Sequence, residues 1–239
     1  METSDINIGF IGAGNMAFGI AKGILLSGEV QPGKVTVSAP SSNNLGRFQE
    51  LDVAVTHSNT EVVAASHLVF LAVKPHIIPQ VLREIAPSIK DHVVVSVAAG
   101  VTIAKIEELL PPEAVVLRLM PNLPCMVQEG ALLFSRGSKA GPQEGAMLKA
   151  LLAPCGLVEE GPEAWIDIHT GLSGSGVAFG AGRLLRDSGR HPAQLRSDVC
   201  TPGGTTIYGL HALELGGLRA ATMGAVEAAT ERARELGRK

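Results

Sequence analysis

The sequence predicts an α/β fold, in which a doubly wound parallel sheet is followed by a smaller all-α C-terminal part. Short apolar segments alternate with amphipathic segments from residue 6 to residue 159, a pattern typical of strands and helices in a parallel sheet. A glycine-rich turn joins the first of these strands to the first helix, and strand-like segments stop after residue 161. We therefore expect a sheet domain over residues 1–162 and a helical domain over residues 163–239.

The expected strands are short, apolar and rich in β-branched residues, which favour extended structure. The first covers residues 6–11 and runs directly into Gly12. The strand at 68–73 ends at Lys74-Pro75, and the strand at 115–120 ends at Pro121-Asn122. The remaining strands are expected at residues 35–38, 53–55, 93–98, 131–134 and 156–159.

The helices are predicted from their apolar spacing. Met16, Ile20 and Ile24 follow one another at intervals of four residues, which places them on one face of a helix, and Gly28 ends this helix. Further helices of the sheet domain are expected at residues 60–65, 77–85, 103–109 and 143–152. The C-terminal part is expected to form helices at 205–215 and 218–236.

The composition excludes several classes of protein. Hydrophobic residues make up 46 % of the 239 residues and the net charge is −3, so the chain is neither disordered nor broadly basic, and we expect no nucleic-acid partner. No apolar run reaches the roughly 18 residues of a membrane span. The three cysteines suggest no disulfide framework, and the first five residues contain no targeting signal, so we expect a cytoplasmic location. The histidines show no metal-ligand spacing, and we expect no metal site.

The segment Gly12-Ala13-Gly14-Asn15-Met16-Ala17 has the spacing of a Rossmann-type dinucleotide loop. Gly12 would form the tight turn, Gly14 would let the backbone approach a diphosphate, and Ala17 would allow the helix to pack closely on the sheet. A glycine turn without a ligand is the alternative. The position of the segment between a strand and a helix favours the cofactor.

The loop after the second expected strand indicates which dinucleotide binds. NAD-specific sites place a carboxylate there for the ribose 2′-hydroxyl, whereas this chain has no acidic residue between Val30 and Gln49. Serine hydroxyls, asparagine amides and Arg47 could hold a 2′-phosphate instead. We therefore favour NADPH over NADH, the alternative being that these polar residues form only a solvated loop.

A second glycine loop, residues 201–206, immediately precedes an expected helix. Its backbone N–H groups and threonine hydroxyls could bind a carboxylate, or the loop could be a plain helix cap. Lys74-Pro75 and Pro121-Asn122 follow sheet strands and are candidate ligand contacts, or ordinary strand-ending loops. No catalytic base accompanies Ser175, and Gly174-Ser175-Gly176 lacks the spacing of a hydrolase nucleophile, so hydrolase chemistry is not expected.

Together these motifs resemble the pyrroline-5-carboxylate reductase family, and the animal cytosolic form in particular. The resemblance is carried by residues 9–17, 71–75, 120–122, 171–176 and 198–206, in that order and spacing. It implies that NADPH or NADH reduces the cyclic imine 1-pyrroline-5-carboxylate to L-proline, in the last step of proline biosynthesis. A homo-oligomer is also implied. Because a protonated imine is already an electrophile, such an enzyme mainly has to orient its substrate.

The resemblance also assigns roles to individual residues. Ser175 and Thr206 are implied at the catalytic centre, where Ser175 begins the helix that approaches the nicotinamide. The implied substrate-binding residues are Thr201, Gly203, Gly204, Thr205 and Thr206. The implied cofactor-binding residues are Gly12, Gly14, Asn15, Met16, Ala17, Ser38, Asn59, Ala72, Val73, Lys74, Pro75, Ala98 and Asn122.

The chain departs from the family pattern between Phe179 and His191. Only eleven residues, GAGRLLRDSGR, stand where family members place the rest of one long helix and a second one. We therefore expect the helical domain to be truncated, assembly to be impaired, and an alternative function as a catalytically impaired nucleotide-binding or interaction protein. A β-hydroxyacid dehydrogenase would need a catalytic lysine in the second domain, but none lies between Lys149 and Lys239.

Overall fold

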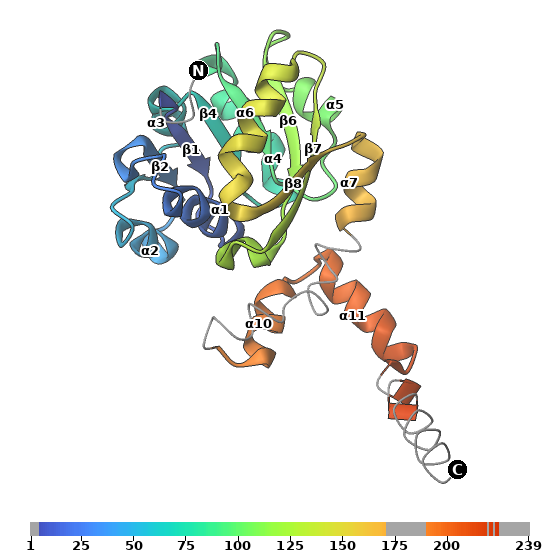
Figure 1. The fold of residues 1–239 in the computed structure, drawn as a ribbon. Coiled ribbons are helices and arrows are strands. Elements are labelled where there is room, and N and C mark those ends of the chain that lie inside the picture. Colours follow the sequence, from blue (N-terminus) through green and yellow to red (C-terminus); the bar gives the residue numbers. More distant parts are fainter. Residues whose placement is uncertain (1–4, 171–189, 219, 222, 225–239) are drawn as a thin grey trace, which may run out of the picture.

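The computed structural model describes residues 5–170, 190–218, 220–221 and 223–224. Its centre is an eight-stranded sheet in the order β3-β2-β1-β4-β5-β6-β7-β8, with helices on both faces (Figure 1). β1 to β6 are parallel, β7 is antiparallel to β6, and β8 is parallel to β7. The predicted α/β fold is confirmed. The strands are β1 Ile8–Ile11, β2 Val35–Ser38, β3 Ala54–Thr56, β4 Leu68–Leu71, β5 Val93–Ser96, β6 Val115–Met120, β7 Gly130–Arg136 and β8 Gly156–Glu160.

Side chains that alternate along the central strands build two hydrophobic cores. Phe10 and Phe70, on β1 and β4, stack with ring centroids 4.8 Å apart in the core beneath α1 and α6. Ile11 and Leu71 point into the opposite core, beneath α3, α4 and α5. Burial on both faces explains why these strands are continuously apolar. The helices are α1 Asn15–Leu26, α2 Gly46–Gln49, α3 Asn59–Ala65, α4 Ile78–Ile85, α5 Ile103–Glu107, α6 Pro142–Leu152, α7 Glu163–His169, α10 Pro192–Val199 and α11 Thr205–Leu215.

Each expected strand is present, and the differences lie at the ends. β4 and β5 end two residues earlier than expected, because the chain turns away from the sheet at the strand ends that face the candidate site. The short helices α2, α7 and α10 were not among the helices expected at stated residues. α2 has only four residues and is anchored by the fully buried Phe48. The expected helix at 218–236 lies largely outside the described residues.

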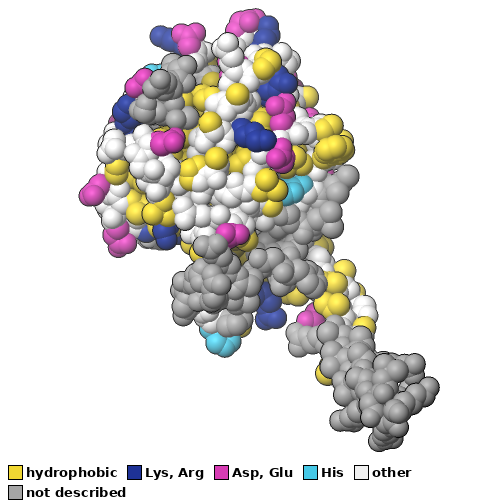
Figure 2. Space-filling model, in the orientation of Figure 1, with side chains coloured by type: hydrophobic (Ala, Val, Ile, Leu, Met, Phe, Trp, Pro, Cys, Tyr) yellow, Lys and Arg dark blue, Asp and Glu magenta, His cyan; other side chains and the backbone are white. Residues whose placement is uncertain are grey.

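α11 contrasts with the sheet domain because none of its residues is buried. Its sequence is apolar on every side, and Tyr208 and Leu215 are 71 % and 77 % exposed. Figure 1 shows α11 running away from the sheet, and Figure 2 shows hydrophobic side chains along the part that projects. A helix of this composition normally packs against other protein surface. Within the described residues no helix is both long and apolar enough to cross a membrane.

Candidate functional site

The loop between β1 and α1 has the geometry that its glycines predict. Gly12 has φ +107°, and a Cβ atom there would lie 2.5 Å from the carbonyl oxygen of Ala72. Glycine alone adopts this conformation without strain and leaves that space empty. Ala17 is fully buried on the face of α1 that packs on the sheet. The loop therefore brings the backbone of β1 against β4 and directs the start of α1 toward the strand ends.

Replacing Gly12 by alanine is expected to weaken dinucleotide binding by about a hundredfold. An alanine at this φ is strained and its Cβ would clash with the Ala72 carbonyl, so the loop would have to shift from its present position. Titration calorimetry with NADPH measures the effect. Gly33→Ala is the matched control, since a Cβ at Gly33 meets open space and its φ is not positive. Unchanged affinity in Gly12→Ala would contradict a loop whose shape binds the dinucleotide.

The N-terminus of α1 is open to a ligand. Gly14 is the N-cap residue, and no side chain caps the helix there. A Cβ at Gly14 would meet no protein atom within 4 Å. Packing within the described residues therefore does not require a glycine at this position, whereas close approach of a ligand would. Unpaired N–H groups and the helix dipole favour an anion at this place.

Hydrogen bonds join the carboxyl ends of the neighbouring strands. Gly12 N–H donates to the Ser38 carbonyl at 2.9 Å, Ala72 N–H donates to the Ile11 carbonyl at 2.8 Å, and Val97 N–H donates to the Leu71 carbonyl at 3.1 Å. The ends of β2, β1, β4 and β5 thus form one continuous edge. Nucleotides bind at such an edge, where the strand order reverses between β1 and β4. The expected cofactor residues belong to the ends of strands β1 to β6 or to the segments that follow them: Gly12, Gly14, Asn15, Met16, Ala17, Ser38, Asn59, Ala72, Val73, Lys74, Pro75, Ala98 and Asn122.

Two expected cofactor residues contact each other at the ends of β2 and β3. The buried Ser38 hydroxyl donates to Asn59 Oδ1 at 2.7 Å, and Asn59 Nδ2 donates to Glu84 Oε2 at 2.9 Å. The Ser38 side chain is thus engaged inside the protein, where it orients Asn59. The exposed serine and asparagine residues of the loop 41–44 remain the polar groups available to a ribose phosphate.

Asn122 and Ala98 are the expected contacts that the structure places at the ends of β6 and β5. Asn122 is buried, and its Oδ1 accepts a hydrogen bond of 2.9 Å from the Ala131 N–H at the start of β7. His169 Nε2 lies 3.1 Å from the Ala131 carbonyl, which ties the end of α7 to the same place. Ala98 N–H donates to the Ser96 hydroxyl at 3.3 Å. Lys74 and Pro75 are exposed after β4.

The second glycine loop leads into α11. Gly203 has φ +71°, and the Gly204 N–H donates to the Thr201 carbonyl at 2.9 Å. A Cβ at Gly204 would lie 2.5 Å from Thr201 Oγ1, so the hydroxyl sits against the helix start. No side chain caps α11. The structure keeps Thr201, Gly203, Gly204, Thr205 and Thr206 together as a surface loop at a helix N-terminus, while α11 points away from the sheet (Figure 1). The expected catalytic residue Ser175 lies outside the described residues.

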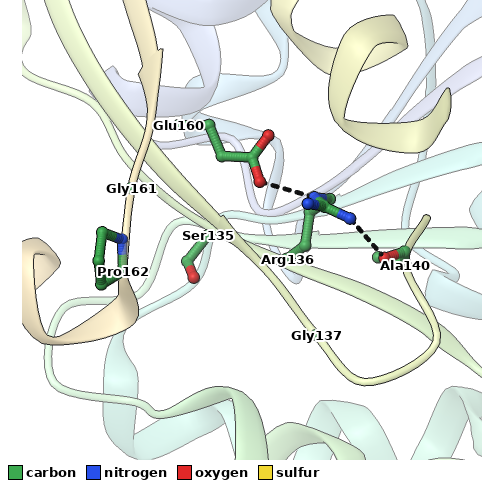
Figure 3. A pocket seen from close by; sticks show the side chains of 7 residues that line it. All are labelled: Ser135, Arg136, Gly137, Ala140, Glu160, Gly161 and Pro162. Atoms are coloured by element: carbon green, nitrogen blue, oxygen red, sulfur yellow. Dashed lines mark hydrogen bonds and ion pairs between the residues drawn. The ribbon is translucent and has the colours of Figure 1, made fainter. Parts of the chain in front are cut away.

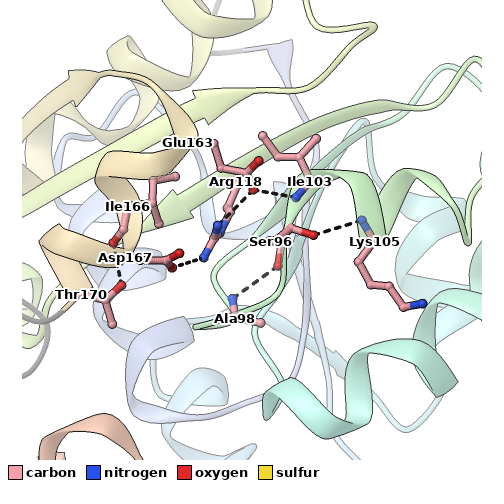
Figure 4. A network of polar contacts seen from close by, with 10 residues as sticks. Ser96, Ala98, Ile103, Lys105, Arg118, Glu163, Ile166, Asp167 and Thr170 are labelled. Atoms are coloured by element: carbon pink, nitrogen blue, oxygen red, sulfur yellow. Dashed lines mark hydrogen bonds and ion pairs between the residues drawn. The ribbon is translucent and has the colours of Figure 1, made fainter.

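A buried arginine that the sequence analysis did not single out connects the sheet to α7. Arg118 on β6 is 1 % exposed, and it donates to Glu163 Oε1 at 3.0 Å and to Asp167 Oδ1 at 2.7 Å (Figure 4). Glu163 Oε1 also accepts from the N–H of Ile103, at the start of α5. The signal in the sequence was an arginine inside the apolar strand VVLRLM. This cluster attaches α7, the first helix after the sheet, to β6 and α5.

A hollow of the described surface lies at the opposite edge of the sheet. It has a volume of about 500 Å³ and is lined by the ends of β7 and β8. Gly137, which lines the hollow, donates its N–H to the carbonyl of Val116 near the beginning of β6. The hollow therefore lies at the amino ends of the parallel strands. Arg136 reaches across it to Glu160 at 2.6 Å and to the Ala140 carbonyl (Figure 3). The hollow is therefore separate from the dinucleotide edge.

Two buried thiols lie near α1 and contribute no nucleophile. Burial raises the pKa of Cys125 to about 12. Burial also raises the pKa of Cys155, and the neighbouring Cys125 adds to this rise. Both thiols are therefore protonated at neutral pH. Among the described residues no cluster of three or more His, Cys, Asp or Glu side chains could bind a metal ion.

Comparison with known proteins assigns the chain to a family. Residues 7–100 match the family model described as NADP oxidoreductase coenzyme F420-dependent, and residues 177–236 match pyrroline-5-carboxylate reductase dimerisation. Pyrroline-5-carboxylate reductase 3 of Danio rerio is 61 % identical, with 100 % of this chain and 94 % of the relative covered. The chain belongs to the pyrroline-5-carboxylate reductase family. The corresponding protein of Macaca fascicularis is 53 % identical over 97 % of this chain and 96 % of its own.

Solved structures of the pyrroline-5-carboxylate reductase family share the fold. The Plasmodium falciparum pyrroline carboxylate reductase with NADP bound has a TM-score of 0.69 and 26 % identity, and the match covers 96 % of this chain and 97 % of that one. A pyrroline-5-carboxylate reductase of Coxiella burnetii has a TM-score of 0.69 and 31 % identity, covering 97 % and 98 %.

The chain is shorter than its reductase relative within the aligned region. The alignment with the Danio rerio protein has 270 positions, whereas this chain has 239 residues. At the remaining 31 positions the relative has residues and this chain has gaps. The segment 180–189, where we expect the shortening, lies outside the described residues.

Proposed function

We propose that this chain is a pyrroline-5-carboxylate reductase that uses NADPH to reduce 1-pyrroline-5-carboxylate to L-proline. The observation that carries the proposal is the open N-terminus of α1 at the carboxyl end of β1, beside the point where the strand order reverses, in a chain of this family. A hydride from the nicotinamide adds to the carbon of the C=N bond, a proton is added to the nitrogen, and NADPH becomes NADP⁺.

The protein's own contribution is binding and orientation. The N-terminus of α1 and the Gly12–Gly14 backbone would hold the diphosphate, and Asn59, fixed by Ser38, would hold the adenine ribose. The N-terminus of α11, with the hydroxyls of Thr201 and Thr206, would hold the substrate carboxylate. No described side chain has to act as a strong acid or base, because the imine is activated by protonation in solution.

Assembly would complete the site. The apolar and exposed α11 belongs to the segment that matches the dimerisation model, which supports burial against a second subunit. We assign dinucleotide binding to residues 1–162, and substrate binding with homo-oligomer formation to residues 163–239. The location that we propose is the cytoplasm, where thiols such as the three free cysteines stay reduced.

A second candidate function is a dinucleotide-binding form with impaired catalysis. Two observations favour it: the relative has residues at 31 aligned positions where this chain has gaps, and none of the residues of α11 is buried. In this form the sheet domain would still fold and bind NADPH, and the substrate loop would lack the surfaces that orient it.

Two measurements on the purified protein distinguish the candidates. Titration calorimetry with NADPH tests the site that both candidates share, and the loss of NADPH absorbance on addition of 1-pyrroline-5-carboxylate tests the reductase. We expect binding together with substrate-dependent oxidation that yields proline. Binding without oxidation would leave the second candidate, and absence of binding would contradict both.

A further inference from the structure

Arg47 makes two hydrogen bonds to the proposed phosphate loop. It lies on α2, and its Nη2 donates to the Ala13 carbonyl at 2.6 Å while Nη1 donates to Asn15 Oδ1 at 2.8 Å. Both acceptors belong to the Gly12–Ala17 segment, more than thirty positions earlier in the chain. A planar guanidinium can serve two separate acceptors with parallel donors, which a lysine cannot.

Aromatic packing holds the Arg47 side chain in this position. Its guanidinium carbon lies 4.7 Å from the ring centroid of Phe18 on α1 and 5.6 Å from that of Phe48 on α2. The two rings meet edge to face at 5.3 Å. Burial of the guanidinium lowers the pKa of Arg47, but the group remains charged at neutral pH. The buried Nε has no hydrogen-bond partner among the described residues, so the hydrogen bonds of this guanidinium are made by its two Nη atoms.

The contact with Ala13 determines where the next N–H points. The Ala13 carbonyl and the Gly14 N–H belong to one planar trans peptide, so they point in opposite directions. Because Arg47 holds the carbonyl on the α2 side, the Gly14 N–H faces away from α2. The Gly14 N–H makes no hydrogen bond to the described residues, and the space around Gly14 is open. This is the N–H that the loop would offer to the diphosphate.

We infer that Arg47 is a positioning residue for the phosphate loop, which it holds in the dinucleotide-binding conformation through the Ala13 carbonyl and Asn15. The role differs from direct recognition of the 2′-phosphate, which the sequence alone also suggested for this arginine. A positioning residue acts on the diphosphate, which NADPH and NADH share. The inference rests on the proposed function, because it concerns the binding of these dinucleotides.

The test compares wild type with Arg47→Met and Arg47→Lys. Titration calorimetry is expected to show that Arg47→Met binds NADPH and NADH about ten- to thirtyfold more weakly, by the same factor for both, since the two charge-assisted hydrogen bonds that hold the loop are lost. Arg47→Lys keeps the charge but lacks the planar fork that spans the two acceptors, and should recover part of the loss for both dinucleotides. In the cofactor-free protein, amide hydrogen exchange of the peptide that contains Gly14 should be faster in Arg47→Met.

Arg83→Met, which removes one exposed positive charge on α4, is the matched control and should change neither affinity nor exchange. Weakened NADPH binding with unchanged NADH binding would overturn the inference in favour of a 2′-phosphate contact. Unchanged affinities and unchanged exchange in a folded Arg47→Met protein would overturn it altogether. If wild type bound neither dinucleotide, the proposed function would fail, and the exchange comparison would still show whether Arg47 holds the loop.

Discussion

Glu163→Gln combined with Asp167→Asn is expected to lower the free energy of unfolding by about 3 kcal/mol. The reason is that Arg118, which is 1 % exposed, would keep its buried charge and lose both carboxylates. The cost is at the lower end of the range for a broken buried pair, because the amide oxygens still accept hydrogen bonds. Urea denaturation followed by circular dichroism measures it.

Adding Arg118→Met to this double variant should recover most of the lost stability, since the buried charge is then removed with its partners. Glu108→Gln is the control, because it breaks an ion pair between two exposed side chains, Lys105 (54 % exposed) and Glu108 (65 % exposed). It should change the free energy of unfolding by less than about 1 kcal/mol. If the double variant were as stable as wild type, Arg118 would not depend on the carboxylates of α7.

Inserting the extra segment of the Danio rerio relative between Phe179 and His191 is expected to raise the turnover of 1-pyrroline-5-carboxylate by about a hundredfold. The physical reason is the exposure of α11: Tyr208 and Leu215 are 71 % and 77 % exposed, so the proposed substrate loop at the start of this helix has little packed surface to support it. Steady-state NADPH oxidation measures turnover, and light scattering should show a dimer or larger assembly.

A glycine-serine insertion of the same length is the control, and it should restore neither turnover nor assembly. NADPH affinity should differ by less than about twofold between the three proteins, because the diphosphate site lies on the sheet domain. A natural chain that already turned over as fast as the chain with the inserted segment, and that formed the same assembly, would show that the shorter helical part is sufficient.

The sheet domain was predictable because its signals are local. Burial on both faces of the sheet makes β1 and β4 continuously apolar, and Gly12 reveals a turn that only glycine adopts without strain. The family resemblance likewise rested on motifs of a few consecutive residues, and the comparisons confirmed it. The small helix α2 was missed because its stability comes from burial of Phe48 rather than from its own sequence.

By itself, the sequence determined the α/β class, the position of the glycine turn after β1 and the set of residues at the carboxyl ends of the strands. Only the tertiary structure decided which hydrogen bonds and ion pairs the polar side chains form. In the structure the Ser38 hydroxyl donates to Asn59, Arg47 donates to the Ala13 carbonyl, and the buried Arg118 of β6 forms an ion pair with Glu163 of α7. The physical reason is that hydrogen bonds and ion pairs of buried groups depend on which distant segments meet, and the spacing of residues along a chain does not contain that information.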